Sequence, residues 1–451
     1  MKFRLILAAT LLLGALPLTA HAQQPWIADR RYGEGIGVRA GDLEVHPGVS
    51  GEFGYDSNYF LRAPSEDPLA AYRLRITPSI TLSTLGPQRR DGITPVVPTV
   101  NFRAGAFAAY NELIAAESAH SKDLSKQRHV DAGGDLNLDL FPQGRVGMDT
   151  HAKFVRVVQA SNDVDTENAY DRDTFGLGAG LTWRPGGGLF EWRAGYDLLY
   201  NYFEHNAFSE LNNYQHSASL RGRWRFLPRT AMLYDGTYSW LHYSNSTYQN
   251  DGSYLKSRIG MNGLVTNHLG FLGMIGWGGT FYAAQAGQPH QQFDSLLAQA
   301  ELKWYLSGQQ GLETVSAPVG LSWVAAGYTR DFSTSYLGNF YRRDRGYATV
   351  SYLLGGVFIA EVTGGLSNVA FPPSYFPNSA TIRNGSFSER RIDAQLFAEY
   401  RLSDTFAINT TENYDANITD AAIAVSSTDP TQTDKLEFSR WQAFIGVRWF
   451  L

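Results

Sequence analysis

Basic side chains at every second position form the most concentrated chemical feature of the sequence. Arg221, Arg223 and Arg225 occupy alternate positions of one segment, and alternate residues of a β-strand point to the same face of a sheet. Neighbouring segments add further cations, and the full basic set is Arg193, Arg221, Arg223, Arg225, Lys256, Arg258 and Lys303. A face with this much positive charge could guide an anionic ligand.

The same part of the sequence also holds carboxylates that could neutralise this face. Glu191 and Asp197 alternate with Arg193 in one segment, and Asp235 lies in the segment after Arg225. Ion pairs among these groups would stiffen the face and leave less free charge for a ligand. We favour internal pairing and keep anion guidance as the alternative.

Residues arranged for catalysis are sparse. His242, Ser244 and Asn245 have the side-chain types of a nucleophilic set, but they are close neighbours in one segment. Adjacent strand residues point to opposite faces, so these three cannot converge on one substrate atom. The sequence has no Cys and no HExxH or P-loop pattern. We therefore expect no enzyme activity, no metal site and no cofactor.

Alternation of apolar and polar residues recurs from Asp42 to the end of the chain and predicts β-strands throughout. The clearest stretch is 173–184. Its apolar face consists of Phe175, Leu177, Ala179, Leu181 and Trp183. The other face contains Gly176, Gly178 and Gly180, whose spacing imitates a nucleotide-binding loop but belongs to a strand.

Eighteen segments of this kind can be recognised. The predicted strands lie near 42–55, 71–83, 97–110, 128–141, 145–158, 172–184, 189–203, 213–226, 230–243, 254–267, 271–284, 293–307, 317–330, 341–354, 357–368, 387–402, 405–416 and 434–451. Tight connections alternate with long polar ones, which lie at 56–70, 111–127, 159–171, 369–386 and 417–433. This alternation is typical of outer-membrane barrels, where turns are periplasmic and loops extracellular.

The N-terminus predicts export from the cytoplasm. A short basic segment precedes an apolar run from Leu5 to Leu18, and Ala20-His21-Ala22 provides a cleavage site. We therefore divide the chain into a signal peptide at 1–22, a short periplasmic segment at 23–41 and a barrel at 42–451.

Charge and composition exclude some classes of protein. The formal net charge is −5, and loss of Lys2 and Arg4 with the signal peptide would make it −7. We do not expect an acidic protein of this kind to bind nucleic acid. The absence of Cys excludes disulfide bonds and thiol chemistry.

Charged residues in the middle of predicted strands distinguish a membrane barrel from a soluble β-sandwich. Lys153, Arg193, Arg221, Lys256 and Lys303 all have such positions, and only a hydrated interior tolerates so many of them. We therefore predict an all-β, transmembrane, antiparallel up-and-down β-barrel of about 18 strands. The basic set, together with Glu191 and Asp197, is expected to line its lumen.

Aromatic residues at the predicted strand ends are expected to form girdles at the membrane interfaces. They are Tyr55, Tyr72, Tyr110, Trp224, Trp240, Trp277 and Trp304. The last segment alternates apolar residues from Trp441 to Leu451, and Phe450 falls outside that register.

The opening strand resembles that of a known group of proteins. Val45-His46-Pro47-Gly48-Val49-Ser50 leads into Gly54-Tyr55-Asp56-Ser57-Asn58-Tyr59-Phe60. This stretch is similar to the outer-membrane β-barrel porins of exopolysaccharide export clusters, which include the 18-stranded barrels of myxobacterial Wzx/Wzy-type secretion. The resemblance implies a terminal conduit for secreted polysaccharide, with a periplasmic polysaccharide-export (Wza-like) protein as partner.

Three functions remain open at this point. The first is the polysaccharide conduit in the bacterial outer membrane, in contact with its lipid and lipopolysaccharide. The second is a general diffusion porin for small solutes, which a loop folded into the lumen would favour, and 111–127 is a candidate for that loop. The third is a structural or adhesive surface barrel.

Overall fold

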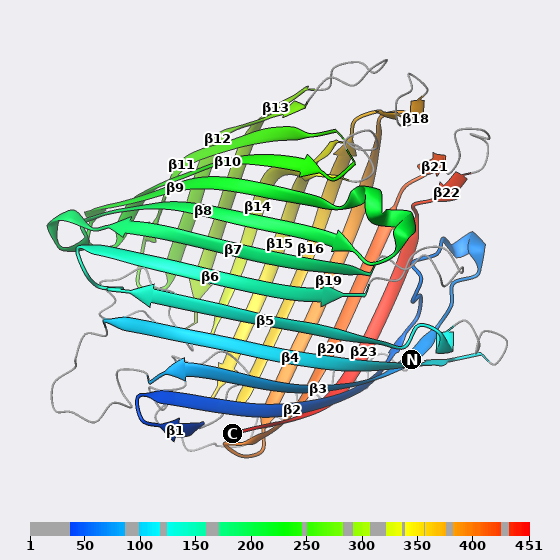
Figure 1. Ribbon diagram of the computed structural model, residues 1–451, viewed down its shortest axis with the longest axis horizontal. Coiled ribbons are helices and arrows are strands. Elements are labelled where there is room, and N and C mark those ends of the chain that lie inside the picture. The colour runs from blue at the N-terminus through cyan, green and yellow to red at the C-terminus, as the bar shows by residue number, and fades with distance from the viewer. Residues whose placement is uncertain are drawn as a thin grey trace.

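A single curved sheet accounts for most of the chain. The computed structural model describes residues 37–85, 99–117, 124–158, 171–245, 250–282, 292–306, 322–335, 339–355, 357–375, 382–424 and 433–451. Within these residues nineteen strands join in one sheet, which curves round on itself (Figure 1). The predicted signal peptide at 1–22 lies outside the described residues. The end of the predicted periplasmic segment forms β1 (Val38–Ala40), which pairs with the start of β2.

Eighteen further strands of the described chain form the wall, and each is antiparallel to its neighbours. They are β2 (Leu43–Asp56), β3 (Ala71–Thr84), β4 (Val100–Ala115), β5 (His129–Leu140), β6 (Val146–Val157), β7 (Arg172–Trp183), β8 (Phe190–Phe203), β9 (Asn213–Leu227), β10 (Thr230–Tyr243), β11 (Gly252–Leu264), β12 (Leu269–Tyr282), β13 (Gln292–Tyr305), β14 (Trp323–Thr334), β15 (Phe340–Leu354), β16 (Phe358–Phe371), β19 (Phe387–Arg401), β20 (Phe406–Ile418) and β23 (Phe438–Phe450). Short pairs extend two of the long connections: β17 (Ser374–Tyr375) with β18 (Ile382–Asn384), and β21 (Ala422–Ala424) with β22 (Thr433–Lys435).

These strands confirm the predicted architecture, because each of the eighteen predicted segments overlaps one strand of the wall. The prediction that 111–127 is entirely loop was wrong. β4 continues to Ala115, since its last residues pair with the start of β3, from Asn111 opposite Arg75 to Ala115 opposite Ala71. We call the end of the wall that bears the long connections the loop end, and the opposite end the turn end.

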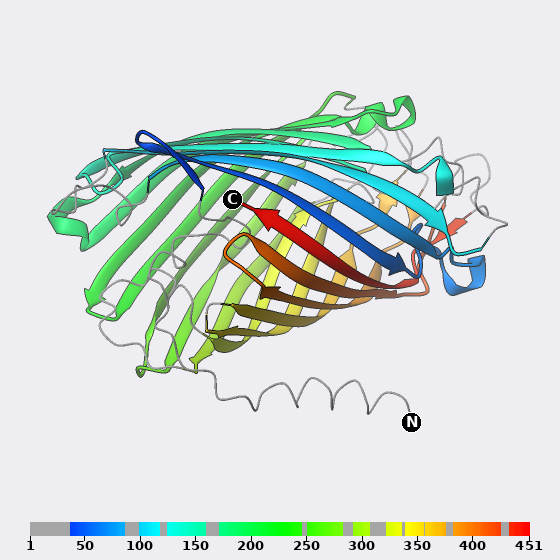
Figure 2. The ribbon, with the colours of Figure 1, turned by 90° about the horizontal axis from the view of Figure 1, so that it is seen from below.

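Pairing of the first and last strands closes the wall. β2 and β23 pair from Gly48 opposite Phe450 to Asp56 opposite Gln442, and Figure 2 shows these two strands side by side. Every wall strand of the described chain therefore has a neighbour on both sides. Closure satisfies the backbone hydrogen-bonding groups that an open edge would expose.

The two faces of the wall differ in polarity. Each wall strand places at least one large, exposed apolar side chain on the same face, such as Leu177, Leu181 and Ile445. The predicted girdle residues also lie there: Tyr72, Tyr110, Trp224, Trp240, Trp277 and Trp304 are exposed, and Tyr55 contacts Tyr72 and Trp441. So large an apolar surface is stable when lipid covers it.

No helix in the described part of the chain combines the length and the apolar character needed to cross a membrane.

The stretch Gly54-Tyr55-Asp56-Ser57-Asn58 binds β2 to β23 at the loop end. We call the pairing of these two strands the seam. The Asp56 carboxylate accepts hydrogen bonds from the guanidinium of Arg440, with Nε at 3.0 Å, and from the side-chain amide of Gln442 at 2.8 Å. The backbone N–H of Ser57 donates to the carbonyl of Trp441, and Ser57 Oγ accepts from the Trp441 N–H. Two strands from opposite ends of the chain are thereby locked in register.

Asn58 then directs the chain away from the wall. Its side-chain amide donates to the carbonyls of Arg62 and Ser439, and its Oδ1 accepts from the Arg62 N–H. Asn58 is almost completely buried. The motif on which the family resemblance rests therefore has a structural role here, in closing the barrel and shaping the first loop.

The turn end of the seam explains the unusual register of Phe450. The N–H of Leu451 donates to the carbonyl of Pro47, which continues the strand pairing to the last residue. Phe450 points to the opposite face and is 1% exposed. The guanidinium groups of Arg401 and Arg448 each lie 5.3 Å from its ring centroid, so the ring serves as an inner cation–π platform.

We expect Asp56→Ala to lower the free energy of unfolding by about 2–3 kcal/mol, because it leaves the partly buried Arg440 guanidinium without its carboxylate. Resistance of the folded barrel to urea, followed as the mobility difference between unheated and heated samples on a denaturing gel, measures this loss. Glu204→Gln is the control: it weakens a more exposed pair with Arg156 and should cost about 1 kcal/mol or less. Equal losses for the two variants would contradict the role of the seam.

Candidate functional site

The charged side chains lie on the inner, concave face of the wall. Asp149 on β6 accepts a hydrogen bond from Arg193 on β8 at 2.8 Å, across the intervening β7. Glu301 on β13 accepts one from Tyr347 on β15 at 2.7 Å, across β14. Side chains two strands apart converge in this way on the concave side of a curved sheet and diverge on the convex side. All nine side chains predicted to line the lumen lie on this inner face, because each alternates with the exposed apolar residues of its strand.

Most of the predicted basic side chains on β8 to β11 form ion pairs with other side chains of the inner face. We call these basic side chains the basic stripe: Arg193, Arg221, Arg223, Arg225, Lys256 and Arg258. Arg223 donates to Glu191 at 3.1 Å. Asp235 lies between two guanidinium groups, 2.8 Å from Arg258 and 3.8 Å from Arg221. Glu191 and Asp235 are partners that the sequence favoured. Ion pairs therefore hold most of the basic stripe in place.

One pairing differs from the sequence prediction. Arg193 bonds to Asp149 rather than to Asp197. Asp197 pairs instead with His151 at 3.0 Å. Both unforeseen partners are on β6, two strands away from β8, and spacing along a single segment could not reveal them.

The remaining predicted cations have three different environments. Lys256 donates to Asp331 at 2.9 Å and to the carbonyl of Phe332. Lys303 lies 3.4 Å from Glu301 on its own strand. Arg225 has no carboxylate partner within the described residues, and its Nε is buried without a hydrogen bond there.

Glycines on the inner face leave room for pairs that span a strand. Gly178 lies in register between His151 and Asp197, and a Cβ at this position would overlap both side chains. A Cβ on Gly180 would lie 2.5 Å from the Arg193 guanidinium. Gly178 and Gly180 are therefore a steric requirement of the ion pairs that cross β7.

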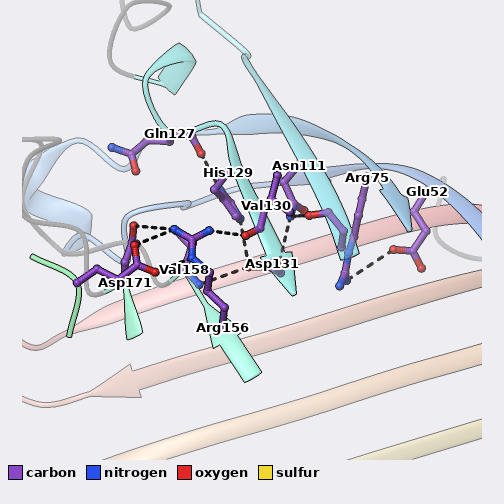
Figure 3. Close-up of polar contacts among 12 residues, drawn as sticks. Glu52, Arg75, Asn111, Gln127, His129, Val130, Asp131, Arg156, Val158 and Asp171 are labelled. Atoms are coloured by element: carbon purple, nitrogen blue, oxygen red, sulfur yellow. Dashed lines mark hydrogen bonds and ion pairs between the residues drawn. The ribbon is translucent and has the colours of Figure 1, made fainter. Parts of the chain in front are cut away.

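A polar network fixes the loop end of β4, β5 and β6 (Figure 3). Asp131 accepts from the side chain of Asn111 at 3.0 Å and from the N–H of Val158 at 3.4 Å. Beside it, Arg156 donates to Glu204 at 2.9 Å. That hydrogen bond holds the pKa of the Glu204 carboxyl below its ordinary value. The network anchors the starts of two long connections.

Residues 57–70 fold inward at the loop end. Tyr59, Phe60 and Leu69 pack with Leu113 of β4 and with Leu124, and all five are almost fully buried. We call this group the mouth cluster. Burial raises the pKa of the Tyr59 phenol above its ordinary range. Of the predicted lumen loop 111–127, Leu124 does pack inward, whereas Leu113 belongs to the inner face of the wall.

The loop ends of β14 and β15 also fold inward, which the sequence did not predict. The pairing of β13 with β14 ends at Ala298 opposite Arg330. Beyond that point Phe332 packs against Phe293 on the inner face of β13, with ring centroids 5.0 Å apart, and Phe340 packs against the same ring at 4.7 Å. We call residues 331–335 and 339–341 the inner tip. The Lys256–Asp331 pair tethers it to β11.

A cavity of about 410 Å³ lies between the inner tip and the wall. Its charged lining residues are Lys256, Arg258, Arg330, Asp331, Arg343 and Arg345, and neutral polar residues together with Ala298 and Phe332 complete it. Lys256 and Arg258 were singled out from the sequence, whereas the other three cations were not. Arg343 and Arg345 show the same two-residue spacing as the recognised stripe, so the signal was present on β15.

His242 does not assemble a catalytic group. Its Nδ1 hydrogen-bonds to Asp251, and Tyr214 packs against its ring at 4.8 Å on the apolar face of the wall. These contacts are typical of a residue at the membrane interface. Across the ranges that the structure describes, no three His, Asp or Glu side chains gather in a way that could hold a metal ion.

A closed eighteen-stranded wall with an apolar exterior and a charge-paired interior defines a transmembrane β-barrel of the outer-membrane type. No protein-family model matches the sequence. A search of curated proteins likewise finds no match.

Several solved structures are similar to this chain in shape, at low sequence identity. OprD of Pseudomonas aeruginosa is 10% identical with a TM-score of 0.42, over 94% of this chain and 99% of that one. OccK5 (OpdH) of Pseudomonas aeruginosa is 7% identical with a TM-score of 0.44, over 91% and 98%. The apoprotein form of the FrpB iron transporter of Neisseria meningitidis is 8% identical with a TM-score of 0.46, over 92% and 82%. The strand pairing of the chain itself establishes its fold.

We expect Gly178→Ala to destabilise the barrel by about 1–3 kcal/mol, because the added methyl group forces the His151–Asp197 pair apart. Gly273→Ala is the matched control, since a Cβ on Gly273 meets nothing within 4 Å. Urea unfolding of both variants measures the difference. The steric role of the inner glycines is wrong if the two alanine variants unfold at the same urea concentration.

Proposed function

We propose that the protein is an outer-membrane pore through which small solutes diffuse. A barrel of 16 to 18 strands encloses an aqueous channel, and the proposal assigns the charged inner face as the lining of that channel. On this proposal the signal peptide is cleaved after Ala22, and membrane lipid and lipopolysaccharide cover the apolar outer face.

The observation that carries this proposal is the narrowing of the loop end from two sides. The mouth cluster rests on β3 and β4, and the inner tip rests on β11 to β13. These groups of strands are about half a circumference apart in the wall. Two inward projections that face each other favour a restricted path for small solutes over a wide path for a polymer.

Ion pairing of the lining supports the same function. Pairs such as Arg193–Asp149 and Arg223–Glu191 hold side chains against the wall. A fixed lining keeps the cross-section of a channel constant while solutes pass.

Polysaccharide export is the second candidate function. It rests on the resemblance of the first strand, and a periplasmic polysaccharide-export protein would then be the partner. In this chain the residues of that resemblance close the barrel through Asp56 and Asn58, so they carry no information about cargo. A structural or adhesive surface barrel is the third candidate.

Planar-bilayer recordings and uptake by proteoliposomes test the proposal. We expect stepwise conductance from the purified full-length chain, and uptake that is fast for small sugars and falls steeply for larger oligosaccharides. Absence of conductance would favour the adhesive barrel. Loss of surface polysaccharide from a deletion strain, with unchanged uptake of small solutes, would overturn diffusion in favour of export.

Removing an aromatic ring from the inner tip should widen the channel. We expect Phe332→Ala to raise the single-channel conductance, because Phe332 packs on the inner face beside Phe293 and holds the tip in place. Phe175→Ala is the control, since Phe175 is exposed on the outer face. A conductance that is unchanged in Phe332→Ala would contradict a constriction at the inner tip.

A further inference from the structure

We propose that the cavity beneath the inner tip is a binding site for a small solute that carries an oxyanion, either a carboxylate or a phosphate. This inference rests on the proposed diffusion function and adds the class of solute that the channel prefers. The observation behind it is an excess of positive charge around this cavity.

The lining of the cavity contains more cations than carboxylates. The lining cations with side chains on the inner face are Lys256, Arg258, Arg343 and Arg345, and Asp331 is the single carboxylate in the lining. The Arg330 side chain lies with Tyr328 and Asp344 on the outer side of the sheet. Asp331 is already engaged by Lys256, with Nζ to Oδ1 at 2.9 Å. The other three inner cations, all arginines, must find their counter-charges among carboxylates outside the lining.

Those counter-charges are shared, so they do not neutralise the site. Asp393 serves both Arg343, at 3.6 Å, and Arg345, whose Nε donates to it at 3.3 Å. Asp235 serves both Arg258 and Arg221.

Two carboxylates therefore serve four guanidinium groups, and the surroundings of the cavity keep a net positive charge. This differs from Arg193 and Asp149, which form a one-to-one pair elsewhere on the wall.

An unused hydrogen-bond donor points to the same chemistry. The buried Nε of Arg258 has no hydrogen-bond partner among the described residues. Guanidinium groups bind the planar oxygens of carboxylates and the oxygens of phosphates through parallel N–H donors. The neutral groups Gln299, Thr329 and Tyr341 add polar contacts in the same lining, which suits a hydroxylated solute.

The size of the cavity fits a small solute. Its volume is about 410 Å³, and small-molecule sites generally enclose roughly 300–1,000 Å³. Its position under the inner tip places it beside the constriction. A bound oxyanion would there interrupt the ionic current, which makes binding directly measurable.

Block of single-channel current by three probes of similar size tests the site: glucuronate, glucose 6-phosphate and glucose. We expect the two anionic sugars to block the potassium chloride current of the wild-type channel in a saturable way, and neutral glucose not to block it. The two anionic probes separate carboxylate from phosphate as the preferred oxyanion, and block by either supports the site.

Single substitutions locate the block. Arg258→Gln and Arg343→Gln should each raise the half-blocking concentration about tenfold, because each removes one charge-assisted contact with the bound oxyanion. Lys153→Gln is the charge-matched control, since Lys153 lies on the inner face of β6 outside the cavity. Urea resistance of each variant shows that its barrel is folded.

The outcomes separate this inference from the proposed function. Absence of channels in the wild-type protein would overturn diffusion itself. Open channels that all three probes block equally, or that none blocks, would overturn the oxyanion site and leave the diffusion pore standing. Equal weakening of block by Lys153→Gln and Arg343→Gln would also overturn it, because a general charge effect would then account for the block.

Discussion

Closure of the wall is the constraint on which the rest of this structure depends. Within a membrane no water is present to satisfy a free strand edge, so the first and last strands must meet along their length. Here that meeting combines backbone pairing from Gly48 to Asp56 with the buried Asp56 carboxylate, which holds Arg440 and Gln442. The fixed circumference then decides which side chains face one another across the interior.

The inner face contains many charged side chains, but ion pairs limit its net charge. Pairs between adjacent strands, such as Arg223–Glu191, and pairs that span a strand, such as Arg193–Asp149, neutralise much of the charge, and glycines such as Gly180 make space for the spanning pairs. Positive charge is left in excess where carboxylates are shared, as Asp393 is between Arg343 and Arg345. The balance of charge therefore varies from place to place along a single wall.

Alternation of apolar and polar residues predicts all eighteen strands, because one face meets lipid and the other meets polar groups in every strand. Local spacing also identifies the stripe through Arg221, Arg223 and Arg225. It cannot identify Asp149 as the partner of Arg193, since that pair depends on strand order and curvature. The inner tip escapes prediction for a related reason: Phe332 continues a strand pattern, while β14 separates from β13 and Phe332 packs on Phe293.

The seam also constrains the order in which the strands can pair during assembly. Asp56 and Arg440 are 384 positions apart in sequence, and closing a loop of that length costs about 5 kcal/mol of chain entropy. Neighbouring strands meet across far shorter connections, so hairpins can form in chain order while β2 still lacks its partner. Until β23 pairs with it, that edge can capture another chain. Assembly therefore requires that the edge of β2 stay protected until the last strand pairs with it.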